Sequence, residues 1–277
     1  MQTNFIPMDN LNNLIIQIQN EVINNICNKS KEEALLNFAC LTTIKAETFE
    51  NQAKQMNNSA FFAISNMDFY AKDGRKIGST YSTDEDNSDA SNPQIFNMMV
   101  YHYTHFLNLI TFARIITGLD YLNLEHHISY NDVKTIVHQS YLIPEDREEV
   151  VCKGLLAGFF RDFTISLNLL APQFENIVRN ILQRNGVKTI TLGEDGKEIE
   201  IGLSNLVKID EFKNLFGEDL TFEIRALLCE SIGPNLRNNT AHGLLNDCEM
   251  NSNFSIYFWW FFFSFIYRTF YSNKQNS

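Results

Sequence analysis

Residues 233–245 read GPNLRNNTAHGLL, and this stretch decides how the rest of the chain is interpreted. Arg237 and Asn238 are adjacent, and His242 follows five residues after the arginine. On a continuous helix of about 3.6 residues per turn, residues five apart are separated by about 140°. Arg237 and His242 are therefore expected to converge only at a helix end or across an interface between two copies. The glycine–proline pair before the motif and the glycine after it are residue types that interrupt helices.

The three side chains of this motif suit the cleavage of a phosphodiester bond. RNA is cut without a metal when its 2′-OH attacks the neighbouring phosphate, which requires one proton acceptor and one proton donor. Imidazole titrates at about pH 6.5 and serves in either role, so His242 is the candidate acid or base. Arg237 keeps its charge and presents a fork of donors to phosphate oxygens, and the Asn238 amide orients the histidine or the phosphate. We therefore predict that Arg237, Asn238 and His242 are catalytic.

The motif supplies one histidine per chain, although the reaction needs two proton transfers. A two-fold dimer that places both motifs on one cleft would provide the second imidazole. The alternative interpretation is structural: Arg237 pairs with an acid such as Glu230 or Asp247, and His242 caps a helix end before Gly243. Short motifs of this kind are hypotheses, so both interpretations are kept.

The longer sequence around the motif resembles the HEPN superfamily of helical RNA-cleaving and nucleotide-binding proteins. The motif has the form RNxxAHG, which is typical of that superfamily. Residues 154–179, GLLAGFFRDFTISLNLLAPQFENIVR, and residues 216–228, FGEDLTFEIRALL, are similar to a bacterial branch of it, and the likeness covers about residues 142–272. The resemblance implies a four-helix bundle, a composite site between two protomers, and a metal-independent endoribonuclease. It also implies a bacterial toxin or anti-phage defence setting, in which a neutralising antitoxin or another defence protein is the expected partner.

Glu175 and Arg179 lie within the resembling passage and are the supporting candidates. They stand four residues apart in the acid-first order that favours an ion pair on a helix. One interpretation is an ordinary pair on a helix surface. The other is that both residues line the site or orient Arg237.

The composition restricts the other functional classes. A net charge of −11 argues against non-specific coating of nucleic acid, because such binding depends on Lys and Arg neutralising phosphates. Five separated cysteines without a CxxC pair indicate neither a zinc site nor a disulfide framework, and they favour the reducing cytoplasm. His102 with His105, and Glu125 with His126 and His127, lack a matching second pair of ligands, so no metal is predicted. No cofactor motif is present and no cofactor is predicted.

Hydrophobic periodicity predicts a mostly α-helical fold with a small β-hairpin insertion and an all-helical N-terminal region. The resemblance implies that the C-terminal part of this fold is a HEPN-like four-helix bundle. Residues 1–77 form the N-terminal region, residues 78–94 an acidic polar linker, and residues 95–277 the domain that contains the bundle. One helix is expected from Met8 to Cys27, and a second from Ser30 to about Gln55. Alternating residues around a Glu-Asp-Gly turn predict the hairpin over 187–201. Pro172 is expected to kink a helix or to begin a new one.

Two further hypotheses stand beside the ribonuclease. The first is a non-catalytic HEPN-like module that binds a nucleotide or a protein, which the acidic charge favours. The second is a scaffold tethered to a membrane by residues 254–267, FSIYFWWFFFSFIY. This run is shorter than the roughly 20 apolar residues that cross a bilayer, so we expect a helix buried in the core and no membrane partner.

Overall fold

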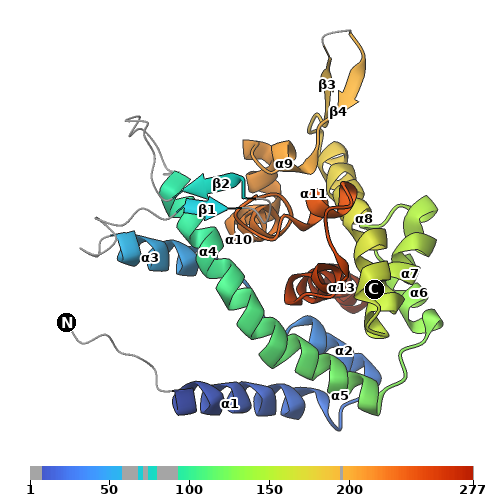
Figure 1. The fold of residues 1–277 in the computed structure, drawn as a ribbon. Coiled ribbons are helices and arrows are strands. Elements are labelled where there is room, and N and C mark those ends of the chain that lie inside the picture. Colours follow the sequence, from blue (N-terminus) through green and yellow to red (C-terminus); the bar gives the residue numbers. More distant parts are fainter. Residues whose placement is uncertain (1–7, 58–67, 71–73, 80–92, 194–195, 277) are drawn as a thin grey trace. The chain divides into compact units, whose positions relative to one another are not determined.

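The computed structural model describes residues 8–57, 68–70, 74–79, 93–193 and 196–276, and it is mostly helical (Figure 1). The chain divides into two compact units that alternate along the sequence. The first unit comprises Met1–Thr43, Asn108–Phe174 and Asn246–Ser277, and the second comprises Ile44–Leu107 and Glu175–Leu245. Residues 142–272, where the sequence predicts the bundle, are divided between both units. Most of the predicted linker, residues 78–94, lies outside the described residues.

The first unit is a helical assembly built around the C-terminal aromatic helix. It also contains the end of α4 (Pro93–Ile110) and the first half of α8 (Phe163–Arg184). Its other elements are α1 (Met8–Ile26), α2 (Lys31–Ala39), the π-helix η1 (Thr111–Ile116), α5 (Thr117–Glu125), α6 (Tyr130–His138), the 3-10 turn η2 (Glu145–Arg147), α7 (Glu148–Phe159), α12 (Asp247–Met250) and α13 (Asn253–Asn276).

Helix α13 forms the core of the first unit, which confirms that the aromatic run is a buried helix. Its side chains from Tyr257 to Phe263 are at most 5% exposed. The polar atoms of this helix are satisfied inside the unit: Trp259 Nε1 donates to the Leu155 carbonyl at 2.9 Å, and Trp260 Nε1 donates to the Phe38 carbonyl at 2.8 Å. Among the described residues, no helix combines the length and the apolar character that crossing a membrane requires.

The close approach of α7 to α13 depends on Gly158. A methyl group at this position would overlap the indole ring of Trp259, which is fully buried. We therefore expect Gly158→Ala to lower the free energy of unfolding by about 1–3 kcal/mol, the usual penalty for overpacking a core. Gly202→Ala is the matched control, because a methyl group there meets nothing within 4 Å and the backbone φ is an ordinary −68°. Urea denaturation of both variants tests this, and equal midpoints would contradict it.

The second unit contains two small antiparallel hairpins packed with helices. Its strands are β1 (Asp68–Tyr70) with β2 (Lys76–Ser79), and β3 (Ile190–Leu192) with β4 (Glu198–Glu200). Its helices are α3 (Ala46–Asn57), most of α4, the end of α8, α9 (Leu203–Leu206), α10 (Asp210–Leu228) and α11 (Leu236–Ala241). In its core Phe49 of α3 stacks on Phe222 of α10, and Tyr103 of α4 contacts both rings edge to face. The hairpin predicted over residues 187–201 is confirmed by β3 and β4.

Two sequence predictions for the N-terminal half are wrong. The helix expected from Ser30 to about Gln55 is broken between Ala39 and Ala46, where β-branched residues of the sequence LTTIK lower the helix propensity. The region of residues 1–77 is also not entirely helical, because β1 and the start of β2 lie within it. The Asp73-Gly74 dipeptide is a hairpin signal of the sequence, and Gly74 adopts a φ of +82°.

Candidate functional site

The RNxxAH motif forms α11, a short helix of the second unit whose start is set by the preceding turn. Asn235 adopts a left-handed conformation with φ 49° and ψ 37° immediately before the helix. Gly233 packs so closely on the Ala226 carbonyl of α10 that a methyl group would collide with it. Leu236 is 2% exposed and anchors the helix, which directs the neighbouring Arg237 away from that apolar contact.

Arg237 is fixed by a buried carboxylate from a distant helix. Its Nε donates to Glu175 Oε2 of α8, although the two residues are 62 positions apart in the sequence. The Glu175 side chain is 6% exposed and the Arg237 side chain 28% exposed. Because a desolvated ion pair holds its geometry more firmly than an exposed one, Glu175 restricts the orientation of the guanidinium. Arg237 therefore pairs with neither Glu230 nor Asp247, and Glu230 instead pairs with Arg225.

Asn238 joins the arginine to the segment after the second hairpin. Its Oδ1 accepts from Arg237 Nη1 at 3.1 Å, and its Nδ2 donates to Ser204 Oγ at 3.3 Å and to Asn235 Oδ1 at 2.8 Å. These bonds fix the amide with its oxygen toward the guanidinium. In the described residues no bond runs from Asn238 to the imidazole of His242, so its role here is to orient Arg237.

His242 ends α11 and is exposed to solvent. It is the C-terminal cap, with φ −98° and ψ 3°, and Gly243 follows with φ +63°. The capping position agrees with the structural interpretation of the sequence, but the imidazole makes no hydrogen bond to the part of the chain that the structure describes. The Nη2 atom of Arg237 likewise has no partner there, because Glu175 accepts from Nε and Asn238 accepts from Nη1. Two groups able to bind or protonate a phosphate are therefore unoccupied at the two ends of one short helix.

Arg179 extends the network to the base of the second hairpin. Its Nη2 donates to Glu175 Oε1 at 2.7 Å and to the Ile201 carbonyl at 3.1 Å. Its Nε lies 2.8 Å from Glu200 Oε2 of β4. The predicted pair of Glu175 and Arg179 thus exists, but it is buried rather than on a helix surface. One carboxylate divides its two oxygens between Arg179 and Arg237.

Sequence reasoning missed two residues of this network, Ser204 and Cys229. Ser204 Oγ accepts from the Asn238 amide, and the Ser204 hydroxyl is a neighbour of the Cys229 thiol. Burial raises the pKa of the Cys229 thiol to about 12, with a further contribution from the nearby carboxylates, so the group is a protonated thiol at neutral pH. Neither residue has a local sequence signal, because each meets the motif only through tertiary packing.

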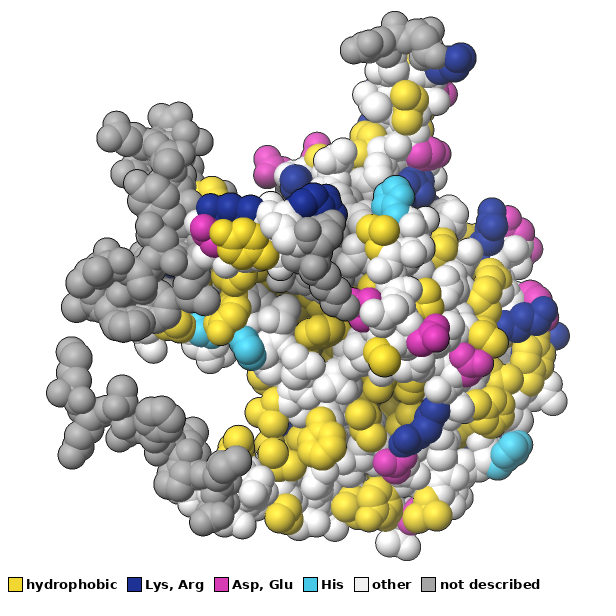
Figure 2. All heavy atoms as spheres, in the orientation of Figure 1, with side chains coloured by type: hydrophobic (Ala, Val, Ile, Leu, Met, Phe, Trp, Pro, Cys, Tyr) yellow, Lys and Arg dark blue, Asp and Glu magenta, His cyan; other side chains and the backbone are white. Residues whose placement is uncertain are grey.

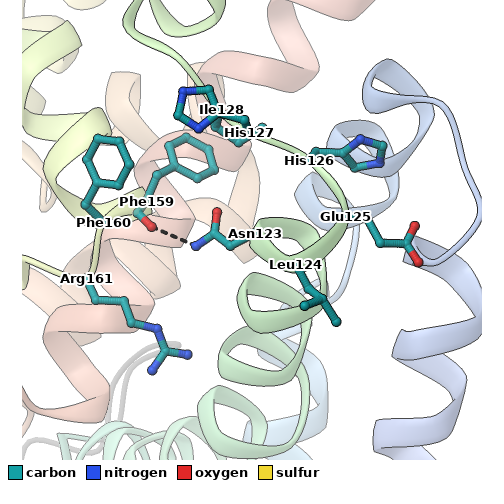
Figure 3. A pocket seen from close by; sticks show the side chains of 9 residues that line it. All are labelled: Asn123, Leu124, Glu125, His126, His127, Ile128, Phe159, Phe160 and Arg161. Carbon is teal, nitrogen blue, oxygen red and sulfur yellow. Dashed lines mark hydrogen bonds between the residues drawn. The ribbon is translucent and has the colours of Figure 1, made fainter.

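A separate pocket of about 390 Å³ lies in the first unit, at the end of α5 (Figure 3). His126 and His127 belong to its lining, but their rings point in opposite directions, and Asn123 Nδ2 donates to the Phe159 carbonyl at 2.8 Å. Arg161, at its rim, pairs with Asp120. The described residues contain no cluster of three His, Cys, Asp or Glu side chains that could hold a metal ion.

His102 on α4 provides a prediction about pH. Its pKa is lowered, first because burial disfavours the charged imidazolium and second because His105 repels it. The unfolded chain then binds a proton more readily than the folded chain, so this contribution to stability is complete above about pH 6.5 and is lost as the pH falls below it. We expect His102→Gln to reduce the loss of unfolding free energy between pH 7 and pH 5. The exposed His127→Gln should retain the wild-type slope, and equal slopes in all three proteins would contradict this.

Comparison of the chain with family models, with curated proteins and with solved structures finds no match. The HEPN resemblance therefore remains a prediction that rests on the motif and on the passages quoted for it.

Proposed function

We propose that the chain is a metal-independent endoribonuclease of the HEPN type. The observation that carries the proposal concerns the partners of the motif: a buried carboxylate fixes Arg237, while Arg237 Nη2 and the His242 imidazole have no hydrogen-bond partner among the residues that the structure describes. Arg237 and His242 are separated by about 7.5 Å of helix rise and by about 140° around the helix, so the arginine of one copy and the histidine of a second copy are the pair proposed to meet around one phosphodiester. Transesterification of RNA requires a fixed cation together with an available acid–base group.

In the proposed reaction the ribose 2′-oxygen forms a bond to phosphorus as the bond to the 5′-oxygen breaks. One imidazole removes the 2′-OH proton, and a second donates a proton to the departing 5′-oxygen. Arg237 binds the non-bridging oxygens, where negative charge develops, and Asn238 and Glu175 hold its guanidinium in place. The products are a 2′,3′-cyclic phosphate and a free 5′-OH. His242 of a second copy is the proposed source of the second imidazole, so the active species is a homodimer.

The resemblance supports the remaining parts of the proposal. It places a HEPN-like four-helix bundle within residues 142–272 and a cytoplasmic role in a bacterial toxin or anti-phage defence system. A neutralising antitoxin or another defence protein would then be the natural partner. Fold resemblance alone does not fix function, so this setting is secondary to the chemistry of the motif.

A non-catalytic module that binds a nucleotide or a protein is the second candidate. It is favoured by the net charge of −11 and by the mixture of acidic, basic and apolar side chains on the face seen in Figure 2. Affinity for long RNA depends on phosphate neutralisation, which this surface provides only locally. Calorimetry with ATP distinguishes the two, because binding without cleavage of RNA would support the module.

The test of the proposal is incubation of the purified chain with single-stranded RNA in excess EDTA. We expect fragments that end in a 2′,3′-cyclic phosphate, and no cleavage of DNA of the same sequence, since DNA lacks the attacking hydroxyl. Cleavage that EDTA abolishes, or fragments with a 3′-OH end, would contradict the mechanism.

A further inference from the structure

The hairpin of β3 and β4 leaves one strand edge open. Ile201 N–H donates to the Thr189 carbonyl and Gly193 N–H donates to the Lys197 carbonyl, both at 2.8 Å, so the two residues that flank β3 direct backbone groups toward the strand of β4. Because these residues alternate along an antiparallel strand, Ile190 and Leu192 turn their backbone groups to the opposite side. Within the described residues nothing pairs with that edge.

The side chains of this hairpin are also uncovered. Leu192 is 65% exposed and Ile199 is 52% exposed, and both strands project beyond α9 (Figure 1). Apolar side chains stand out on the same arm in Figure 2. An isolated two-stranded hairpin has marginal stability in water, and a sheet of more strands is more stable. Open edges are usually protected by charge, but β3 and the residues directly beside it, 189–193, carry none.

We infer that the outer edge of β3 pairs with β3 of a second copy, which produces a four-stranded antiparallel sheet across a two-fold axis at Thr191. In this register Ile190 lies opposite the partner's Leu192, so the outward N–H and C=O groups of one copy meet those of the other. The same register places aliphatic side chains against each other on one face, and Thr191 faces the partner's Thr191 as a pair without hydrogen bonds.

The charges on the hairpin favour pairing of β3 with β3 of a second copy over the pairings that involve β4. Pairing through β4 would set Glu198 opposite the partner's Glu200, and like charges directly opposite each other destabilise a sheet. Pairing of β3 with a partner's β4 does not close on itself and would lead to open assemblies. Two copies that each carry a charge of −11 can approach most easily along an uncharged strand.

The pairing has a consequence for the motif. Glu200 and Ile201, at the base of this hairpin, are held by Arg179, which shares the Glu175 carboxylate with Arg237. An ordered sheet would therefore stabilise the network that orients the arginine. The association does not depend on the proposed ribonuclease activity.

Cysteine cross-linking of the full-length chain tests the interface. Cα atoms in an antiparallel pair without hydrogen bonds are about 4.5 Å apart, which is within the range of a disulfide. In a background with the exposed Cys40 and Cys248 replaced by Ser, we expect Thr191→Cys to form a covalent dimer on mild oxidation. Ile199→Cys, on β4 of the same hairpin, should remain monomeric. Equal cross-linking of the two variants, or none with Thr191→Cys, would overturn the inference.

Sedimentation of charge variants provides the second measurement. Leu192→Lys replaces both apolar contacts with the partner's Ile190, so the association constant should fall about tenfold. The equivalent change Ile199→Lys, on the opposite face, should leave it within twofold. These readouts involve no RNA, so failure of the interface and failure of the ribonuclease proposal are separate results. Association that Leu192→Lys and Ile199→Lys weaken equally would contradict the proposed edge.

Discussion

Replacing His242 with Ala is expected to reduce the rate of RNA cleavage by about 10²–10⁴-fold, the usual contribution of a positioned acid or base. The free energy of unfolding should change by no more than about 0.5 kcal/mol, because the imidazole is exposed and without a partner among the described residues. Initial rates under single-turnover conditions measure the first quantity, and urea denaturation measures the second.

His138→Ala is the matched control for this prediction. His138 is also exposed and ends a helix, α6, but its Nδ1 contacts Glu148 in the first unit at 3.1 Å. Its loss should leave the cleavage rate unchanged. If His242→Ala and His138→Ala retain the same activity, His242 is not the acid or base and the structural interpretation of the motif is preferred.

Replacing Glu175 with Gln is expected to lower the free energy of unfolding by about 2–4 kcal/mol. The change keeps the shape of the side chain but leaves Arg179 and Arg237 without their shared counter-charge. Removing one partner of a fully buried pair costs about 3–5 kcal/mol, and the partial exposure of Arg237, 28%, reduces that figure. Cleavage should also slow, because the guanidinium loses the contact that orients it.

Glu198→Gln is the control for the Glu175 substitution. Glu198 is an exposed acid of β4, and its replacement should change the stability by less than about 0.5 kcal/mol. Chemical denaturation compares the two variants directly. A Glu175→Gln protein as stable as the wild type would show that the ion pair does not hold the network together.

The local elements of the fold were predictable because they depend on short-range patterns. Helix α1 follows a stripe of apolar residues at three- and four-residue spacing, and the β3–β4 hairpin follows alternation around a glycine turn. The burial of α13 was predictable because its apolar run, residues 254–267, is shorter than the roughly 20 apolar residues that cross a bilayer. In each case one short stretch of sequence contained the residues that determine the element.

The predictions that failed concern helix boundaries at which the local sequence pattern and the packing of the core favour different positions. Pro172 was expected to kink a helix or to begin a new one, and it does not begin one: it lies inside α8, where the apolar contacts of Leu170 and Phe174 on either side, each 0% exposed, outweigh the lost backbone bond. The break that the sequence assigned to Pro172 occurs earlier, where Arg161 adopts a φ of +64°. Helix propensity alone does not show at which of two possible positions a helix is interrupted, because the packing of the core also contributes.

The residues of the candidate site were predictable from the sequence, but the contacts between them were not. Arg237, Asn238 and His242 are visible as a motif, and Glu175 with Arg179 as a spaced pair. The contact between Glu175 and Arg237 spans 62 positions, so no local pattern shows that one carboxylate serves both arginines. Ser204 was missed for the same reason.

The most direct measurement of the central claim uses DNA oligonucleotides that contain one ribose at a fixed position within randomised sequence. In excess EDTA the wild-type chain is predicted to cut only after that ribose and to leave a 2′,3′-cyclic phosphate, and His242→Ala is predicted to leave the pool intact. Cutting at deoxyribose positions, or cutting by His242→Ala at the wild-type rate, would contradict the claim that Arg237 and His242 act together on a phosphodiester.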